Sequence, residues 1–260
     1  MNLQIKNAYL LRAFLELKKE KWFRADFFMS FFSIFIKSCL SYFVFRAIFM
    51  HSVQVDANQI TLYYIIVNIV ALTVQAGMYV AYNHMEDINT GAIIPELLRP
   101  LSYPVSRYLN DLLLTISHLV VNLFLIFLVS ACFGDIIGIM ELLLGFLSVL
   151  LGFTVLYLIQ AIIGCFAVWF HDITRFRDVI YTLLLALGGR LLPSDLLYSG
   201  LKEIVYYTPL PYVYDIPVKV LMGNAGCHQI GIQLLWVFLL GAVYVYLFQC
   251  HVKHNVEFGG

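Results

Sequence analysis

The sequence predicts an all-α integral membrane protein with six transmembrane helices, an N-terminal interfacial amphipathic helix and a re-entrant helical hairpin before the last span. Hydrophobic residues make up 62% of the 260 residues and charged residues only 12%, against about 45–50% and about 25% in an average soluble domain. The apolar residues form runs long enough to cross a bilayer, and Lys and Arg gather between particular runs. A soluble domain of this composition could not cover its apolar surface.

The first element, residues 1–26, is expected to be a cytoplasmic helix at the membrane interface. Leu10, Ala13, Phe14 and Leu17 share one helical face, and charged residues occupy the opposite face. This pattern is typical of a helix with its apolar side in the lipid boundary. A helix that binds a soluble partner is the alternative. Residues 27–260 are expected to form one six-helix transmembrane domain.

Six stretches of low charge are candidate spans, because about 20 apolar residues cross a hydrocarbon core roughly 30 Å thick. A continuous helix over residues 136–170 would be about 52 Å long, so we expect a short outer-surface helix before the fourth span. The fifth span is short because Pro193 ends it. The predicted spans are residues 27–49, 60–82, 109–133, 145–170, 178–192 and 230–252.

A hairpin is predicted at about residues 193–227, before the last span. Two short amphipathic stretches, residues 196–207 and 212–222, are separated by Thr-Pro-Leu-Pro and are rich in tyrosine. Tyrosine concentrates at the level of the lipid headgroups, because its ring is apolar and its hydroxyl is polar. We therefore expect a helical hairpin that dips into one leaflet. Two helices lying flat on the surface are the alternative.

The distribution of Lys and Arg gives the orientation. Eleven of them fall on one side of the predicted spans, and only Lys202 and Lys219 fall on the other. Basic residues accumulate on the cytoplasmic side, so both termini are expected in the cytoplasm, as an even number of spans requires. Sixteen basic residues balance sixteen acidic ones, and no basic excess indicates binding to nucleic acid.

Motifs that would indicate catalysis are missing from the sequence. It contains no phosphate-binding P-loop, no zinc-protease H-E-x-x-H and no G-x-S-x-G nucleophile motif. The five cysteines are scattered without metal-ligand spacing. The pair His171-Asp172 lies among other charges and is interpreted as a charge-paired turn rather than an acid–base pair. We therefore predict no catalytic residue and no metal site.

Six polar residues lie inside the predicted spans at similar depths. Burial of an unpaired polar group in hydrocarbon costs several kcal/mol, so these side chains need partners or water. They either form hydrogen bonds between helices or line a polar substrate path or a subunit interface. The charge of Lys37 favours the path or the interface. The six residues are Lys37, Asn68, Gln75, His118, Asn122 and Gln160.

Small residues recur in the predicted fourth span. Gly138, Gly145 and Gly152 are seven residues apart, and Ser148 lies between the last two. Such a stripe allows two helices to approach closely. We expect it to serve packing within the chain or between subunits.

The longest cytoplasmic connection, about residues 83–107, contains a predicted short helix. Pro95 suits the first turn of a helix and Pro100 ends it. Ile94, Leu97 and Leu98 would give this helix an apolar face. A short amphipathic helix beneath the membrane is expected to dock a partner. A helix that only rests on lipid headgroups is the alternative.

With these elements, the sequence resembles the membrane subunit of a type-2 ABC exporter over nearly its whole length. Residues 91–100 are similar to the glycine, double leucine and proline of the coupling loop of that permease family. Leu192-Pro193 and the stretch to Gly223, rich in Pro and Tyr, are similar to its proline-broken hairpin. The terminal Gly259-Gly260 resembles the ending of a subgroup of small permeases.

The resemblance implies a permease subunit rather than an enzyme, in the plasma (inner) membrane of a prokaryote. It implies two separate ABC ATPase subunits, which bind ATP and magnesium, and a second permease, identical or similar, in a dimer. No cofactor is expected on this chain. The ATPase-contact residues would be Glu86, Asp87, Gly91, Glu96, Leu97, Leu98 and Arg99. The outer gate would be formed by Pro193, Tyr206, Tyr207, Pro209 and Pro211.

The predicted function is export of a lipid-like, drug-like or peptide substrate with energy from ATP. An intramembrane transferase acting on a lipid is one alternative, and it would expose a catalytic His or carboxylate in a water-filled cavity. A channel-like or scaffold membrane protein is the other, and it would work without an ATPase.

Overall fold

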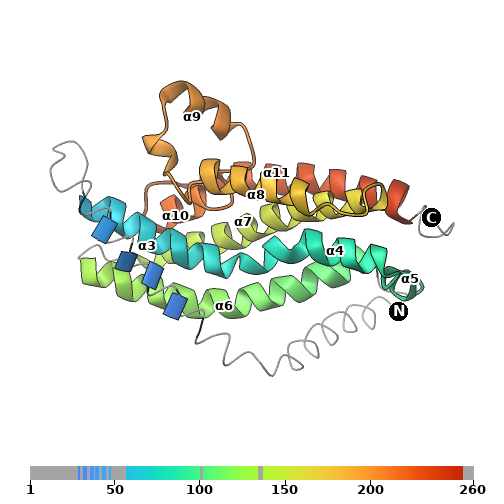
Figure 1. The fold of residues 1–260 in the computed structure, drawn as a ribbon. Helices are drawn as coiled ribbons and strands as arrows, with labels where there is room; N and C mark the ends of the chain where they lie inside the picture. The colour runs from blue at the N-terminus through green and yellow to red at the C-terminus, as the bar shows by residue number, and fades with distance from the viewer. Residues whose placement is uncertain are drawn as a thin grey trace.

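The computed structural model describes residues 57–99, 102–133 and 137–253, together with separate helical positions between residues 29 and 47. The predicted interfacial helix of residues 1–26 and most of the first predicted span lie outside the described residues. The described helices form an elongated bundle (Figure 1). In chain order they are α3 (Ala57–Thr73), η1 (Gln75–Tyr79), α4 (Val80–Asn89), α5 (Ile93–Leu97), α6 (Tyr103–Phe133), α7 (Ile139–Cys165), η2 (Phe166–Val168), α8 (Thr174–Leu187), η3 (Ser194–Leu196), α9 (Ser199–Tyr206), α10 (Asp215–Leu221), α11 (Cys227–Leu247) and η4 (Phe248–Lys253).

The two ends of the bundle carry different elements. Helix α5 lies at one end, after α4, and we call this the α5 end. Helix α10 lies towards the opposite end, beside α3, and we call this the α10 end (Figure 1). Helix α9 projects from the bundle. The chain thus separates the predicted coupling segment from the predicted hairpin along the length of its long helices.

Three described helices are long and apolar enough to cross a membrane, or four if a bent pair counts as one span. They are Tyr103–Ala131, Ile139–Val168 and Cys227–Lys253, and the pair is Asn58–Thr73 with Gln75–Asn89, bent by 55°. These coincide with four of the predicted spans. Helix α8 has 14 residues and is about 21 Å long, which is too short to cross alone.

Helix α7 is the centre of the bundle. It packs against α4, α6, α10 and α11. In its most apolar window 56% of the residues are buried, against 22% for α6 and 17% for the last span. A helix that is hydrophobic on all sides is suited to such a position. The other long helices surround α7 and keep one face outward.

The expected break in the region of residues 136–170 is wrong. One continuous helix runs from Ile139 to Cys165, with Gly138 in extended backbone before it. The glycines at 145 and 152 lie within this continuous helix, and residues of the α10 segment pack directly against them. Its 27 residues give about 40 Å of helix, a length that tilting accommodates in a bilayer.

The expected end of the fifth span is also wrong. Helix α8 ends at Leu187, before Gly188 and Gly189, and not at Leu192-Pro193. Gly189 has a φ of +92°, a left-handed conformation that favours glycine. The glycine pair therefore turns the chain before the proline is reached.

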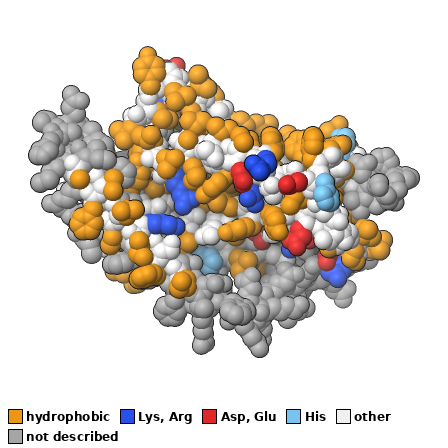
Figure 2. All heavy atoms as spheres, in the orientation of Figure 1, with side chains coloured by type: hydrophobic (Ala, Val, Ile, Leu, Met, Phe, Trp, Pro, Cys, Tyr) orange, Lys and Arg blue, Asp and Glu red, His pale blue; other side chains and the backbone are white. Residues whose placement is uncertain are grey.

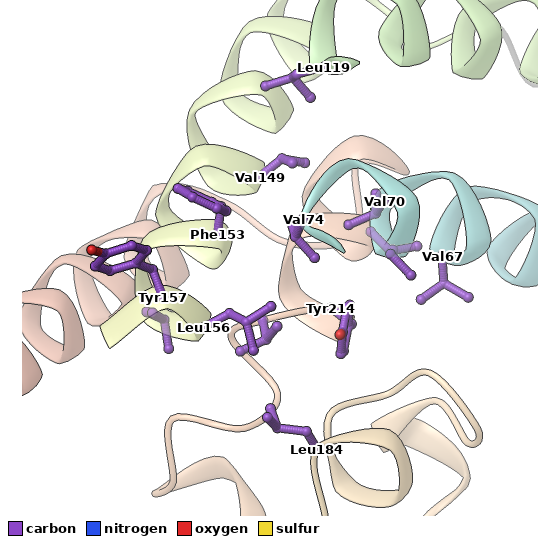
Figure 3. Packing of buried hydrophobic residues seen from close by; sticks show 14 of the residues in the cluster. Val67, Val70, Val74, Leu119, Val149, Phe153, Leu156, Tyr157, Leu184 and Tyr214 are labelled. Carbon is purple, nitrogen blue, oxygen red and sulfur yellow. The ribbon is translucent and has the colours of Figure 1, made fainter. Parts of the chain in front are cut away.

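The apolar core joins helices from the whole chain. Val67 of α3, Val74 between α3 and η1, Phe153 of α7, Leu184 of α8 and Tyr214 before α10 are buried and belong to one cluster (Figure 3). In a membrane, contact with lipid tails is already apolar, so helix association depends on close packing rather than on removal from water. The interdigitated branched and aromatic side chains provide such packing.

The surface of the bundle is also apolar. Hydrophobic side chains cover much of the face shown in Figure 2. Phe124 on α6 and Phe238 on α11 are 62% and 77% exposed. Such a surface is suited to lipid, because a soluble monomer rarely exposes large apolar patches.

The two helices of the predicted hairpin exist but are not equivalent. Helix α10 is buried against α3 and α7. On α9, by contrast, Ile204 is 68% exposed and only Val205 is buried. The hairpin therefore places one helix in the bundle and one outside it.

The predicted small-residue stripe serves packing within the chain. A Cβ at Gly145 would clash with the side chain of Leu221 on α10, and one at Gly152 would lie 2.9 Å from the carbonyl oxygen of Val213. The hydroxyl of Ser148 donates to Oε1 of Gln233 on α11 at 2.8 Å. Both α10 and α11 approach α7 along this stripe.

We expect Gly152→Ala to destabilise the protein by about 1–3 kcal/mol, because a backbone oxygen would have to move. Gly231→Ala on α11 is the matched control, since a Cβ there would meet no described atom within 4 Å. The control should be neutral or slightly stabilising. Thermal unfolding in detergent measures both variants, and equal unfolding temperatures would contradict the close contact.

Candidate functional site

A buried carboxylate stands at the start of α10. Asp215 is 0% exposed. Its Oδ2 accepts a hydrogen bond from the hydroxyl of Ser194 at 2.6 Å and lies 2.9 Å from Nζ of Lys219. Its Oδ1 lies 2.7 Å from the hydroxyl of Tyr63. Removal of a charge from water is costly unless it is paired and hydrogen-bonded, and these three side chains provide both.

The turn after α8 brings the partners of Asp215 together. The amide of Asp215 donates to the carbonyl oxygen of Gly188 at 3.0 Å. The Tyr63 hydroxyl also lies 2.8 Å from the carbonyl oxygen of Gly189, so one phenolic proton serves two acceptors. A Cβ at Gly189 would lie 2.8 Å from the same hydroxyl and would clash with Cβ of Asp215. Glycine is required here for space as well as for its positive φ.

Ion pairs continue from this carboxylate to the surface. Nζ of Lys219 lies 2.8 Å from Oδ2 of Asp195, and Nζ of Lys202 on α9 lies 2.8 Å from Oδ1 of the same residue. Two acids and two bases therefore alternate from the inside of the bundle to the projecting helix. We call Tyr63, Ser194, Asp195, Lys202, Asp215 and Lys219 the Asp215 network. It joins α3, η3, α9 and α10.

The sequence analysis missed Asp215 and interpreted Lys202 and Lys219 only as markers of orientation. The signal that could have revealed the acid is the spacing of Asp215 and Lys219, four residues apart on one helical face. The contribution of Tyr63 could not be seen, because it is 152 residues away from Asp215.

The predicted gate residues flank this network. Pro193 and Pro211 are buried, whereas Tyr207 is 80% exposed and Tyr206 is 37% exposed. The hydroxyl of Tyr212 donates to the carbonyl oxygen of Tyr206 at 3.3 Å. The two prolines thus belong to the packed part of the hairpin, and the two tyrosines lie on its outer part. Their role as a gate stays a prediction.

The polar residues predicted inside the spans do not share one environment. Nδ2 of Asn122 on α6 donates to the hydroxyl of Thr73 on α3 at 2.8 Å, with both residues buried. This is a hydrogen bond between helices. Gln160 is 1% exposed, and its Oε1 has no hydrogen-bond partner among the described residues.

The remaining members of the set are more exposed. Asn68 and His118 are half-buried, and Gln75 and Lys37 are exposed. The structure therefore does not gather the six side chains on one continuous surface. Their assignment to a substrate path or a subunit interface stays a prediction.

Gln233 of α11 is a buried polar residue that the sequence analysis did not identify. It is 0% exposed, and its Nε2 donates to the carbonyl oxygen of Tyr212 at 2.9 Å. Together with its bond from Ser148, this contact ties α7, α11 and the start of the α10 segment.

At the α5 end, the predicted coupling segment forms a turn and a five-residue helix. Gly91 has a φ of +72° and turns the chain between α4 and α5. Ile93 is 1% exposed and anchors α5 in the core, while Ile94 and Leu98 are 49% and 83% exposed. The predicted apolar face of Ile94, Leu97 and Leu98 is therefore wrong in part, because Leu97 packs inward against the core.

The charged residues of this segment divide into two groups. The carboxylate of Asp87 accepts a hydrogen bond from the hydroxyl of Tyr103 at 2.6 Å and pairs with Arg107 at 3.0 Å. Asp87 thus ties α4 to the start of α6. Glu96 and Arg99 pair at 2.8 Å on the surface, and Glu86 is exposed.

A second loop meets the coupling segment. Nδ2 of Asn89 donates to the carbonyl oxygen of His171 at 2.8 Å. The neighbouring Asp172 accepts hydrogen bonds from the amide and hydroxyl of Thr174 at 2.9 and 2.6 Å. These bonds lower the pKa of Asp172 and give the first amide of α8 a partner, and the interpretation of His171-Asp172 as a charge-paired turn stays a prediction.

The apolar helices, the central α7 and the segment at the α5 end define a helical multi-pass membrane protein. The family model described as "ABC-2 family transporter protein" matches residues 26–256, and the chain belongs to this family. The chain is therefore the membrane component of a transporter, as its resemblance predicted. A search of characterised proteins finds no significant match.

We expect Asp215→Asn to lower stability by about 3 kcal/mol or more, because it breaks a buried ion pair by removing one partner. Asp195→Asn is the matched control, since the side chain of Asp195 is 60% exposed and exposed pairs contribute about 1 kcal/mol or less. Thermal unfolding in detergent measures both. Equal losses of stability in the two variants would show that Asp215 does not stabilise the Asp215 network more than a surface acid does.

The Asp215 network is expected to lose stability at low pH. Burial alone would raise the pKa of Asp195, but hydrogen bonds and ion pairs from Lys202 and Lys219 outweigh it and hold this pKa below its usual value. The stabilisation is therefore complete above the unfolded pKa of about 3.9 and is lost as the pH falls through the lower folded pKa.

Between about pH 5 and pH 3, the unfolding temperature of the wild type should fall more than that of Asp195→Asn, which has no carboxylate to protonate at this position. Glu203→Gln, a change of an exposed acid on α9, should keep the wild-type slope. If Asp195→Asn shows the wild-type slope instead, this carboxylate does not contribute to the acid sensitivity.

Proposed function

We propose that the chain is the permease subunit of an ATP-driven exporter, which moves a lipid-like, drug-like or peptide substrate out of the cytoplasm. ATP is hydrolysed by separate ABC ATPase subunits, two in each complex. Membership of the ABC-2 transporter family over residues 26–256 is the observation that carries this proposal. No cofactor is assigned to this chain.

The geometry of α5 supports the docking of an ATPase at this end. Ile93 is buried and anchors the helix in the core, whereas Ile94 and, just after the helix, Leu98 are exposed. These two residues are one helical turn apart and form a small apolar knob. Such a knob can fill a groove on a partner. Because α5 is anchored in the core, a movement of the partner would then displace the helices as well.

The path from α5 into the membrane helices is short. Asp87 of α4 contacts Tyr103 and Arg107 of α6, so a displacement of the segment between them acts on both helices. Coupling between sites requires a physical element whose arrangement both sites can bias. The α4–α5–α6 corner is the proposed element.

The charge distribution supports a cytoplasmic α5 end. Arg99, Arg107 and Lys253 belong to this end, whereas Lys202 and Lys219 belong to the α10 end. Basic residues favour the cytoplasmic side. We accordingly assign the termini to the cytoplasm, the α10 end with its gate to the outside, and the protein to the plasma membrane of a prokaryote.

A second permease, identical or similar, completes the proposed complex. Lys37 is exposed on its helix, and a charge within a span needs water or a partner. A position at the interface between permeases, or on the substrate path, would supply one.

Leu98→Asp tests the proposal, because it places a charge in the apolar docking face without changing the core. The full chain, purified from its own cells in mild detergent, should bring down an ATP-hydrolysing subunit. The variant should reduce this association by at least tenfold, since an unpaired buried charge costs roughly 3 kcal/mol or more. Membrane insertion should stay normal.

Ile204→Asp is the matched control, because Ile204 is similarly exposed but lies on α9. It should leave ATPase association unchanged. If wild-type protein brings down no ATPase, the channel-like, scaffold and transferase functions gain and the exporter proposal fails. If Leu98→Asp retains full association, α5 is not the docking element.

A further inference from the structure

Arg190 follows the two glycines after α8, and its charge has no acidic partner. Its Nη1 donates to the hydroxyl of Tyr181 on α8 at 3.4 Å, which is long for a hydrogen bond. No Asp or Glu among the described residues forms an ion pair with it, and the two acids of the Asp215 network are both paired with lysines. Arg190 therefore carries a positive charge that no described acid neutralises.

The turn that carries Arg190 is held by contacts on both sides. The hydroxyl of Tyr64 on α3 donates to the carbonyl oxygen of Leu191 at 2.7 Å. The amide of Leu191 donates to the carbonyl oxygen of Leu185 on α8 at 3.0 Å. The backbone beside Arg190 is thus fixed before any ligand arrives, which lowers the entropy lost on binding.

Tyr214 provides a second polar group beside Arg190. Its ring belongs to the apolar cluster (Figure 3) and lies against Gly188, where a Cβ would be 3.2 Å from Cδ2 of the tyrosine. Its hydroxyl is buried and has no hydrogen-bond partner among the described residues. Burial raises the pKa of Tyr214, and the charge of Arg190 acts against this rise. A small rotation of the guanidinium would therefore give the buried hydroxyl a donor.

The unused donors of this cluster match an oxyanion. Arg190 and Tyr181 are both half-buried, so a ligand can reach them from outside the bundle. The guanidinium presents five N–H groups in a planar fork that fits the oxygens of a carboxylate or a phosphate. The Tyr181 hydroxyl accepts a hydrogen bond from Arg190 and keeps its own proton to donate.

The surroundings of the cluster favour an anion that carries a hydrophobic chain. Leu183 on α8 is 43% exposed, and Leu191 and Leu192 are 58% and 45% exposed. A charge next to lipid-facing surface needs water or a partner. A small hydrated anion would gain nothing from the leucines, whereas the chain of an amphiphile would cover them.

We propose that Arg190 and Tyr181 bind the anionic headgroup of an amphiphile at the α10 end, with Tyr214 as a positioning residue that holds the guanidinium. The oxyanion accepts hydrogen bonds from Arg190 and Tyr181, and the apolar chain lies along the exposed leucines. The inference goes beyond the proposed function, because this binding requires neither ATP nor a partner subunit.

Native mass spectrometry of the full chain in mild detergent tests the proposal. The probes are phosphatidylglycerol and a diacylglycerol with the same acyl chains but without the phosphate. The wild type should bind phosphatidylglycerol roughly tenfold more tightly than diacylglycerol, because hydrogen bonds between ionised groups are strong. Arg190→Gln should lose this preference, and Arg190→Lys should keep part of it. If Arg190→Gln does not fold, Arg190→Lys and Tyr181→Phe replace it.

Arg175→Gln is the matched control, since it removes an exposed charge at the opposite end of α8. It should keep the wild-type preference for phosphatidylglycerol. Equal affinity of the wild type for the two lipids, or an equal loss in Arg190→Gln and Arg175→Gln, overturns the proposal. Displacement of phosphatidylglycerol by inorganic phosphate at equal concentration would identify a plain anion site and would overturn the assignment to an amphiphile.

Tyr214→Phe tests the positioning residue with two readouts. The unfolding temperature without lipid should stay the same or rise, because the variant removes an unsatisfied buried hydroxyl. The affinity for phosphatidylglycerol should fall by about three- to tenfold, as expected for one lost hydrogen bond. Tyr212→Phe is the control in the same segment, since its hydroxyl bonds to the carbonyl oxygen of Tyr206, and its affinity should not change. Wild-type affinity in Tyr214→Phe overturns the role of Tyr214.

Discussion

The burial of the Asp215 carboxylate is the constraint around which the α10 end is arranged. A charge that is 0% exposed obliges its neighbours to provide donors and a cation, and each neighbour comes from a different part of the chain. Tyr63 fixes α3, Ser194 fixes the turn after α8, and Lys219 fixes the face of α10 that points to them. Polar contacts, rather than helical hydrogen bonds, therefore position the chain after the end of α8. The same contacts position the short helix α10.

Close packing of α10 and α11 against α7 complements the Asp215 network. The stripe of Gly145, Ser148 and Gly152 lets α10 and α11 approach α7, and the approach brings Lys219 into range of two acids. A larger residue in the stripe would displace α10 and strain the network at once. Apolar contacts and ion pairs at this end therefore depend on one another.

The sequence predicts the membrane class, three of the spans (four if the bent pair counts as one), the two short helices before the last span and the short helix after Gly91, because each is recorded in local patterns of hydrophobicity and proline. It does not predict where α7 begins or where α8 ends. Both boundaries depend on glycines, and the length of an apolar run says little about which glycine interrupts a helix. At 145 and 152 the neighbours fill the space beside the helix, whereas at 188 and 189 the chain turns.

Site residues show the same division. The exposed Leu98 and the turn at Gly91 follow from amphipathicity and glycine, but the inward direction of Leu97 depends on the position of α5 against the bundle. The role of Asp215 is not predicted from the sequence, because its partners at positions 63 and 194 are distant from it along the chain. Pairing across such distances is a tertiary property, and a single chain without its fold does not display it.

The 55° bend between α3 and α4 makes this part of the chain two arms with different attachments. The first arm, α3, contacts the Asp215 network through Tyr63. The second arm, α4, leads to α5, and its Asp87 contacts Tyr103 of α6. Between them, η1 is only five residues long and rests on α7 at Gly77, where a Cβ would already touch Leu156 at 3.2 Å. Because η1 packs against the central helix α7, any change in the angle between the two arms would turn about this contact.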